Sequence, residues 1–176
     1  MDQMKRVVSV LLLTVLFLAS FALAADEDRI LGLWNTAEND CKIEIFKSNG
    51  KYFGRIAWLK EPLYPADDEG GLAGRPVIDR ENPNQNLRSR PLIGLQLMKG
   101  FSYVGKNVWE KGTIYNPDNG KTYRCKMTLS VSDRLEVRGF IGIPLLGATS
   151  VWTRDAEGRD YSDYRKPGIG VNKNPP

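Results

Sequence analysis

The sequence predicts an all-β fold, in which about eight antiparallel strands close into an up-and-down barrel. Three observations lead to this prediction. Between residues 30 and 154, apolar and polar residues alternate with a period of two, and no segment has the period of an amphipathic helix. The strand-like runs are short, and tight-turn pairs such as Asn49-Gly50 and Asn119-Gly120 separate them. Closure into a barrel removes both sheet edges, which favours it over the alternative of a two-sheet β-sandwich.

Each strand is predicted from its own pattern. Residues 41–46 place Cys41, Ile43 and Ile45 on one face of a strand and polar side chains on the other. Residues 123–131 alternate in the same way, and glycine, proline or Asn-Gly pairs punctuate the intervening turns. The predicted strands are residues 30–36, 41–46, 51–60, 92–98, 107–115, 123–131, 135–142 and 148–154.

The two ends of the chain and one long connection fall outside this pattern. Residues 1–24 have the basic start, apolar run and small-x-small end of a signal peptide cleaved after Ala24, although an uncleaved membrane anchor is the alternative. Residues 25–154 then form one barrel domain, with a connecting loop at 61–90. Residues 155–176 form a polar tail that we predict to be disordered. The expected location is the periplasm or the medium.

Charge and composition exclude several classes of function. The formal net charge is +4, and loss of Asp2, Lys5 and Arg6 with the leader would lower it by one to +3. No block of like charge indicates a nucleic-acid partner. The chain has no histidine, which excludes serine and cysteine triads and the usual zinc ligand sets. The sequence therefore predicts no cofactor, no metal and no catalytic residue.

Three linked motifs carry a family resemblance. They are NPNQNLRSRPLIGLQLMKGF (82–101), WEKGTIYNPDNGKTYRCKM (109–127) and LEVRGFIGIPLLGATSVWTR (135–154), in that order. Together they resemble the exported bacterial domain-of-unknown-function family 2147 over roughly residues 30–154. The resemblance implies a lipocalin-like barrel in the cell envelope and no settled activity. A second cysteine pair that often lies in the long connection of this family is missing here.

Lipocalins carry Gly-x-Trp on the first strand and an arginine on the last strand that lies over the tryptophan. The matching residues here are Gly32 and Trp34 at one end of the barrel sequence and Arg154 at the other. A guanidinium stacked on an indole is a cation–π contact worth about 0.5–2 kcal/mol. We therefore expect these three residues to close the barrel.

Arginines and acids cluster where the long connection meets the next strand. Arg88 and Arg90 lie two residues apart, so in an extended chain both would point the same way and could grip an anionic group. The preferred interpretation is structural: we predict that both lie at the barrel rim and hold the loop there, with at least one in contact with Asp79 or Glu81. A glycosidase-like pair of Asp79 and Glu81 is the third interpretation, without support from any fixed spacing.

Three consecutive carboxylates, at residues 67–69, offer oxygen ligands but lack the spacing of a calcium loop, so a solvated loop is the preferred interpretation.

The predicted strands are rich in aromatic residues, some of which must form the core while others could line a barrel mouth. They are Trp58, Tyr103, Trp109, Tyr115, Tyr123 and Phe140, of which Trp58, Tyr103, Trp109 and Tyr123 join Arg88 and Arg90 as ligand-binding candidates. Cys41 and Cys125 fall on apolar phases, and the sequence leaves open whether a disulfide joins them.

The leading hypothesis is a non-enzymatic exported barrel that binds a small apolar or anionic amphipathic ligand. One alternative is an envelope protein-protein interaction module with a filled interior. The other is a carboxylate- or metal-dependent enzyme, which the missing histidines and motifs disfavour. After cleavage of the leader, no membrane-spanning segment is expected.

Overall fold

The structure is a computed structural model that describes residues 27–130 and 133–155. The predicted signal peptide, and all of the predicted tail except Asp155, lie outside the described residues. The chain divides into two compact units, Met1–Ile30 and Leu31–Pro176. In the first unit, the described residues contain a 3-10 turn, η1 (Asp28–Ile30). Over the described ranges, no helix combines the length and the apolar character needed to cross a bilayer.

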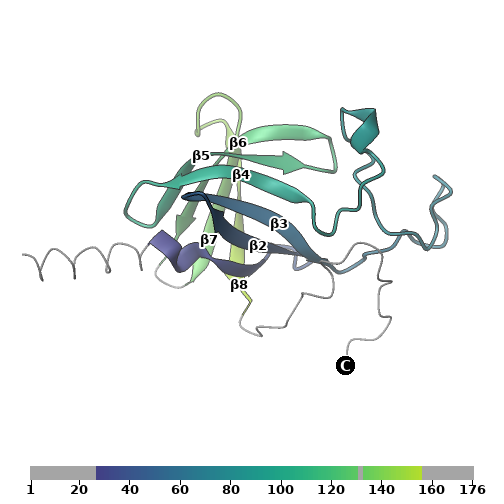
Figure 1. The fold of residues 1–176 in the computed structure, drawn as a ribbon, viewed down its shortest axis with the longest axis horizontal. Helices are drawn as coiled ribbons and strands as arrows, with labels where there is room; N and C mark the ends of the chain where they lie inside the picture. Colours follow the sequence, from purple (N-terminus) through teal and green to yellow (C-terminus); the bar gives the residue numbers. More distant parts are fainter. Residues whose placement is uncertain (1–26, 131–132, 156–176) are drawn as a thin grey trace, which may run out of the picture. The chain divides into compact units, whose positions relative to one another are not determined.

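The second unit is an all-β closed barrel in which eight antiparallel strands follow one another in sequence order, as Figure 1 shows. The predicted up-and-down barrel is confirmed, and the β-sandwich is excluded. The strands are β1 (Gly32–Asn35), β2 (Cys41–Ser48), β3 (Lys51–Leu59), β4 (Gln96–Tyr103), β5 (Val108–Asn116), β6 (Lys121–Leu129), β7 (Arg134–Phe140) and β8 (Gly147–Arg154).

Seven strands match the predicted ranges to within a few residues, but β4 begins at Gln96 rather than at residue 92. Pro91 pairs with Ile78 in an isolated bridge, and the Leu95 amide donates to the Leu92 carbonyl at 2.9 Å. Gly94, with φ of +87°, sits inside this turn. Residues 92–95 therefore belong to the long connection, although their apolar character suggests a strand.

Local turn chemistry fixes the hairpin between β2 and β3. Asn49 and Gly50 both have positive φ, +48° and +70°, as a two-residue hairpin of the favoured twist requires. Asparagine and glycine are the residues that adopt this conformation at least cost. The predicted turn is confirmed.

The barrel has one filled end, defined by the β2–β3, β4–β5 and β6–β7 turns. Large inward-facing side chains crowd this end and are almost fully buried: Trp34, Tyr52, Phe101, Trp109, Leu129, Leu135 and Trp152. Tyr52 meets Trp109 edge to face at 6.1 Å between ring centroids, an arrangement that aromatic quadrupoles favour. The opposite end, which we call the mouth, carries the β1–β2, β3–β4, β5–β6 and β7–β8 connections.

The first and last strands close the barrel through a short seam. Trp34 lies opposite Arg154, and Asn35 lies opposite Thr153; these are the two residue pairs of β1 with β8. The Arg154 guanidinium lies 4.3 Å from the Trp34 ring centroid and donates to the Leu31 carbonyl at 3.0 Å. The predicted contact between Trp34 and Arg154 is confirmed.

Gly32 contributes to the same seam. Its φ is +119°, which an L side chain rarely adopts, and an added Cβ would lie 3.5 Å from Nη1 of Arg154. Glycine at this position therefore lets β1 turn into the barrel beneath the arginine. The three residues predicted to close the barrel do lie together.

Candidate functional site

The inward-facing side chains become small and solvent-accessible toward the mouth. On β7, Leu135 and Val137 are buried, whereas Gly139 on the same face is partly exposed. On β8, Trp152 is buried, and its indole N–H donates to the Ser150 hydroxyl at 3.0 Å. Ala148 continues the same face and is exposed. An unbroken register pairs Gly139 with Ala148, so both face the interior.

Two larger side chains, from the neighbouring strands β5 and β6, lie beside Gly139 on the inward face. Ile114 on β5 pairs with Tyr123 on β6, and both are partly exposed. A Cβ added at Gly139 would lie 3.6 Å from Ile114 and 3.8 Å from Cβ of Tyr123. Asn119 of the β5–β6 turn donates to the Tyr123 hydroxyl at 3.1 Å. The mouth residues, as we call them, are Ile114, Tyr123, Gly139, Ala148 and Ser150.

The chemistry of the mouth residues suits a small amphipathic molecule. Apolar contact comes from Ile114, Ala148, the backbone at Gly139 and the ring of Tyr123. Polar contact comes from the hydroxyl groups of Tyr123 and Ser150. Filling of the opposite end limits how far a ligand could enter. The mouth residues are therefore mainly apolar, and the large side chains of the filled end lie behind them.

Both cysteines are free thiols, so the bridge that the sequence left open between Cys41 and Cys125 is not formed. Cys41 lies on β2, which pairs with β1 and β3, whereas Cys125 lies on β6, which pairs with β5 and β7. Their strands are not neighbours, and a disulfide needs close Cα atoms. Burial raises the pKa of each thiol to about 12. Neither cysteine is therefore a thiolate nucleophile at neutral pH.

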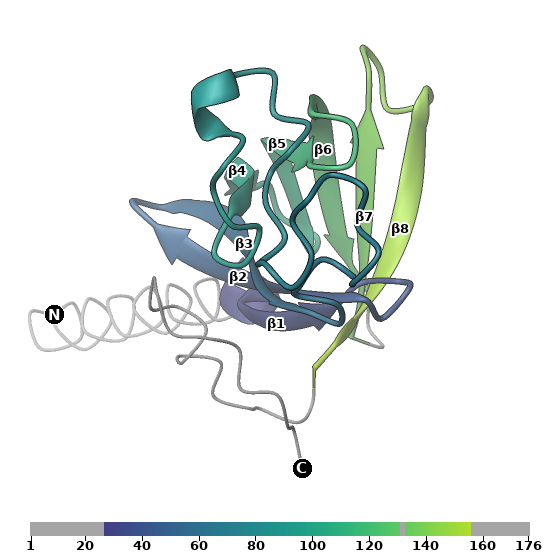
Figure 2. The ribbon, with the colours of Figure 1, turned by 90° about the vertical axis from the view of Figure 1, so that its right-hand side faces the viewer.

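The long connection between β3 and β4 is an organised segment. Isolated bridges join Leu63 to Pro76 and Ile78 to Pro91, and a 3-10 turn, η2 (Gln85–Leu87), follows. The Asn84 side chain caps this turn by accepting from the Asn86 amide at 3.1 Å. In Figure 2 the connection runs in front of the barrel, on the side that carries the mouth.

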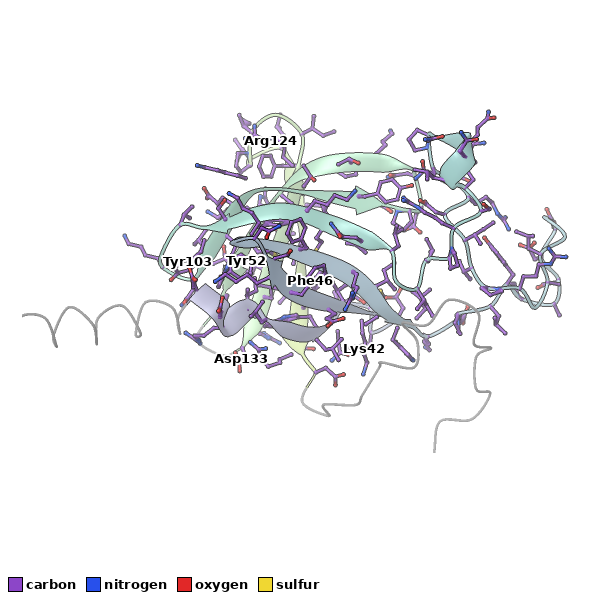
Figure 3. All side chains as sticks on the ribbon, viewed as in Figure 1. Lys42, Phe46, Tyr52, Tyr103, Arg124 and Asp133 are labelled. Carbon is purple, nitrogen blue, oxygen red and sulfur yellow. The ribbon has the colours of Figure 1, made fainter. Side chains whose placement is uncertain are left out.

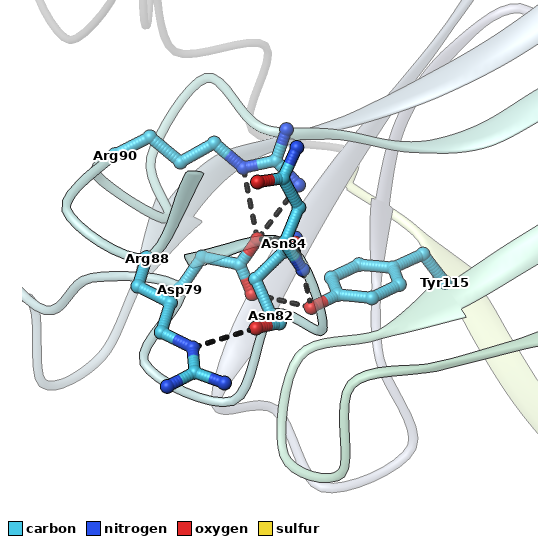
Figure 4. A network of polar contacts seen from close by, with 6 residues as sticks. All are labelled: Asp79, Asn82, Asn84, Arg88, Arg90 and Tyr115. Carbon is cyan, nitrogen blue, oxygen red and sulfur yellow. Dashed lines mark hydrogen bonds and ion pairs between the residues drawn. The ribbon is translucent and has the colours of Figure 1, made fainter. Parts of the chain in front are cut away.

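Asp79 is the centre of a polar network that fixes this connection, shown in Figure 4. Its side chain is 0% exposed. One carboxylate oxygen accepts from Arg90 Nε at 2.8 Å, Arg90 Nη2 at 2.6 Å and Asn82 Nδ2 at 2.7 Å. The other oxygen accepts from the Tyr115 hydroxyl at 2.6 Å. Asp79 also donates its amide to the Arg90 carbonyl at 3.0 Å.

The network shifts the pKa of two of its members. Burial alone would raise the pKa of Asp79, but hydrogen bonds from Tyr115, Asn82 and Arg90, with the charge of Arg90, bring it below the usual value. Burial and the hydrogen bond to Asp79 raise the pKa of Tyr115 to about 12. The aspartate is thus ionised and fully partnered, which is the state of a structural anchor rather than of a catalytic acid.

The same segment packs against the β5–β6 turn. Gly120 has a φ of +67°, and a side chain there would collide with the carbonyl group of Glu81. Tyr115 projects from the outer face of β5, because its neighbours Ile114 and Asn116 lie on the inward phase. The connection is therefore tied to the outside of the barrel beside the mouth.

Arg88 and Arg90 have different roles in the structure. Arg90 contacts Asp79, so the predicted contact of at least one of these arginines with a local acid is confirmed. Arg88 is exposed and donates through Nε to the Asn82 carbonyl at 2.7 Å. Only Arg90 is held by a carboxylate; Arg88 presents the rest of its guanidinium to solvent.

Separate alanine variants test this division. Arg90→Ala is expected to lower the melting temperature by several degrees, since a loss of about 1–2 kcal/mol shifts a domain of this size by ~2–4 °C per kcal/mol. Arg88→Ala is expected to shift it by no more than about 2 °C. Thermal unfolding followed by circular dichroism measures both. Equal losses would contradict the assignment of Arg90 alone as the anchor.

The acidic run at residues 67–69 is a surface loop with its own internal partner. Asp68 accepts from the Leu72 amide at 3.0 Å and from Arg80 at 3.1 Å. The hydrogen bond from the Leu72 amide, more than the nearby Arg80 guanidinium, lowers the pKa of Asp68. Across the described ranges, no three acidic or cysteine side chains gather as a metal site would require.

Of the four aromatic candidates, Tyr123 alone lies in the mouth. Trp109 is 0% exposed in the filled end, and the Tyr103 ring packs against it in a tilted arrangement, 5.1 Å between centroids. Trp58 pairs with Lys42 on the outer face, where the lysine ammonium lies 5.6 Å from the ring centroid. Trp58, Tyr103 and Trp109 therefore lie away from the mouth residues, and their role in ligand binding stays a prediction. In Figure 3, Tyr103 and Lys42 lie far apart on the barrel.

Sequence reasoning missed Tyr115 and Asn82 in the network, and Ile114, Gly139, Ala148 and Ser150 in the mouth. The alternation pattern already places these last four on inward phases. A search for small residues at the ends of inward phases, rather than for aromatic residues, would have found Gly139, Ala148 and Ser150. The pairing of Tyr115 with Asp79 joins residues 36 positions apart and has no local signal.

Comparison with known proteins places this geometry in context. The family described as "Uncharacterized protein conserved in bacteria (DUF2147)" matches residues 32–154. Among solved structures, protein HP1028 from Helicobacter pylori, described as belonging to the lipocalin family, is similar with a TM-score of 0.63. The two share 22% sequence identity, over 81% of this chain and 93% of that protein. At this identity the likeness shows the fold alone, a lipocalin-like barrel. No curated protein matches the sequence.

Proposed function

Because this chain belongs to the bacterial family DUF2147 and folds as a lipocalin-like barrel, we propose that it binds a small amphipathic molecule at its mouth and catalyses no reaction. The proposal includes export to the periplasm or the medium, which rests on the leader-like residues 1–24. It assigns no cofactor and no nucleic-acid partner.

The observation that carries this proposal is the change along β7 and β8 from large buried side chains to small accessible ones. Val137 gives way to Gly139, and Trp152 gives way to Ser150 and then Ala148, all on the inward face. A barrel that served only as a scaffold would gain stability from larger apolar side chains here. Small, accessible inward residues at Ala148 and Ser150 support the proposal that another molecule is accommodated here.

Arg88 is the remaining candidate for an anionic group on the ligand. Among the described residues its guanidinium has no carboxylate partner, in contrast to that of Arg90. A free fork of N–H donors suits a carboxylate or a phosphate. If Arg88 binds the ligand, Arg88→Ala should lose bound ligand without losing stability.

A plug in the mouth tests the proposal. Ala148→Trp places an indole where the inward face is open, so it is expected to remove most of the bound small molecule and to change the melting temperature by only a few degrees. Native mass spectrometry of protein purified from its host measures the bound mass. Val151→Trp is the matched control, because Val151 is 39% exposed on the outer face of the same strand.

The wild-type protein and the control should both carry the extra mass. A wild-type protein without bound molecule, or an Ala148→Trp variant that retains it, would contradict the proposed binding site. Native mass spectrometry also serves a second candidate function, an envelope interaction module, which the filled end of the barrel favours. A co-purifying protein in place of a small molecule would support that candidate.

A further inference from the structure

The loop between β7 and β8 carries an exposed aliphatic patch. Ile141, Ile143, Leu145 and Leu146 are 69%, 56%, 81% and 68% exposed, all within six consecutive residues. Elsewhere among the described residues, the large exposed apolar side chains, Leu87, Val104 and Val151, are spread over different elements. Isolated exposed aliphatics are ordinary, whereas a contiguous group indicates an interaction surface. We call residues 141–146 the aliphatic loop.

Two arginines on the barrel strands bind the backbone of this loop. Arg138 on β7 donates to the Pro144 carbonyl at 2.7 Å, to the Leu145 carbonyl at 3.3 Å and to the Thr149 hydroxyl at 2.7 Å. Arg124 on β6 donates to the Gly142 carbonyl at 2.9 Å. Figure 3 labels Arg124 beside the loop. The arginines therefore fix the shape of the loop.

This arrangement satisfies five of the six carbonyl groups of the aliphatic loop within the protein. Besides the three carbonyls bound by arginine, the Ile143 carbonyl accepts from the Leu146 amide at 3.0 Å. The Leu146 carbonyl accepts from the Ile141 amide at 3.3 Å, and Pro144 has no amide hydrogen. Five consecutive carbonyls are thus partnered. Immersing such a loop in an apolar medium costs less than immersing a loop whose acceptors depend on water.

The charge beside the aliphatic loop is positive, and none of the described residues forms an ion pair with Arg124 or Arg138. The hydrogen bonds of Arg124 and Arg138 all go to neutral acceptors, and Arg124 also lies over the Phe140 ring at 5.3 Å. Glu136 is the acid on the same face of β7, two residues from Arg138, and it lies toward the filled end. The formal charge of the whole chain is also positive, at +4. These guanidiniums retain N–H donors that a phosphate could accept.

We propose that the aliphatic loop docks this protein onto an anionic phospholipid surface. The four aliphatic side chains enter the boundary between headgroups and acyl chains, and Arg124 and Arg138 lie at the level of the phosphates. Interfacial binding of this kind combines buried apolar area with attraction to anionic lipid. The loop stands at the mouth end of the barrel, so docking would bring the mouth residues to the membrane surface. The inference goes beyond ligand binding and does not depend on it.

Vesicle flotation tests the proposal. The probes are vesicles of phosphatidylglycerol with phosphatidylethanolamine and, separately, neutral vesicles of phosphatidylcholine. The wild-type protein is expected to bind the anionic vesicles more strongly, and ~0.5 M salt should weaken this preference because it screens exposed charge. Ile143→Ser with Leu145→Ser should reduce binding by about tenfold or more. Arg124→Gln should reduce the preference for anionic vesicles.

The matched control removes two exposed aliphatics from other elements, as Leu87→Ser with Val104→Ser, and should bind like the wild type. The single change Leu146→Ser removes one aliphatic side chain of the loop and replaces the double variant in the vesicle test if that variant folds poorly. Wild-type protein that does not bind anionic vesicles, or a loop double variant that binds as well as the wild type, would overturn the proposal. A dimer that the loop double variant converts to monomer, with no vesicle binding by either protein, would show a self-association surface and overturn it as well.

Discussion

Replacing Trp34 by alanine is expected to lower the free energy of unfolding by about 3–5 kcal/mol. The indole is 0% exposed at the filled end of the barrel, where its removal leaves a cavity that rigid neighbouring strands cannot fill. Trp34 also carries one of the two residue pairs that join β1 to β8, so the loss affects closure as well as packing. Chemical denaturation measures the change in the free energy of unfolding. In thermal unfolding the same loss should lower the melting temperature by about 6–20 °C.

A double-mutant cycle with Arg154 isolates the contact between the two side chains. Arg154→Ala alone should cost about 1–2 kcal/mol, because the arginine covers the indole and bonds the Leu31 carbonyl. The two losses should be non-additive by at least about 0.5 kcal/mol. Trp58→Ala is the control, since this tryptophan lies on the outer face and is partly exposed. Additive losses below about 1 kcal/mol for Trp34 and Arg154 would contradict their role in barrel closure.

Replacing Asp79 by alanine is expected to cost about 2–4 kcal/mol, because donors of Arg90, Tyr115 and Asn82 lose their common acceptor. Asp79→Asn should cost less, since the amide oxygen can still accept. Urea denaturation at neutral pH measures both changes. Glu81→Gln is the matched control: Glu81 is an exposed acid of the same segment, and the change should stay within ~0.5 kcal/mol.

The same variants give a signature in acid. The pKa of Asp79 is lower in the folded protein than its ordinary value of about 4. The stabilisation by the charge of Asp79 is therefore fully present at pH values above its ordinary pKa. It is lost as the pH falls through the lower pKa of the folded protein. The stability difference between wild type and Asp79→Asn should shrink from about pH 5 to about pH 2. A difference that stays constant over this range would contradict the ionised, hydrogen-bonded state of Asp79.

The barrel could be predicted because its determinants are local. Alternation places Ile43, Ile45 and Met127 on inward phases, and Asn49-Gly50 imposes a turn without help from the rest of the chain. The start of β4 could not be predicted, because residues 92–95 are apolar yet held in the connection by the bridge of Pro91 with Ile78. Which of two apolar segments pairs in a sheet depends on partners that are remote in sequence.

The site was predicted less completely than the fold for a similar reason. The pairing of Arg90 with Asp79 follows from proximity in sequence, and the structure confirms it. Tyr115 reaches the same carboxylate from β5, which only the folded barrel brings near. The sequence also does not reveal which aromatic residues lie at which end of a barrel, so Trp109 and Tyr123 look alike until the register is known.

The seam between β1 and β8 has a consequence for how the barrel wall opens. In the described residues, two residue pairs join these strands, the fewest of the eight neighbouring strand pairs, against seven between β7 and β8. Separating them breaks fewer hydrogen bonds than separating β7 from β8, so we expect local fluctuations to part the wall there first. Residues 147–152 of β8 have no partner on β1, so the parting begins close to Ala148 and Ser150. For the ligand binding proposed above, such a parting would give a route to the interior sideways through the wall, without passing over the rim.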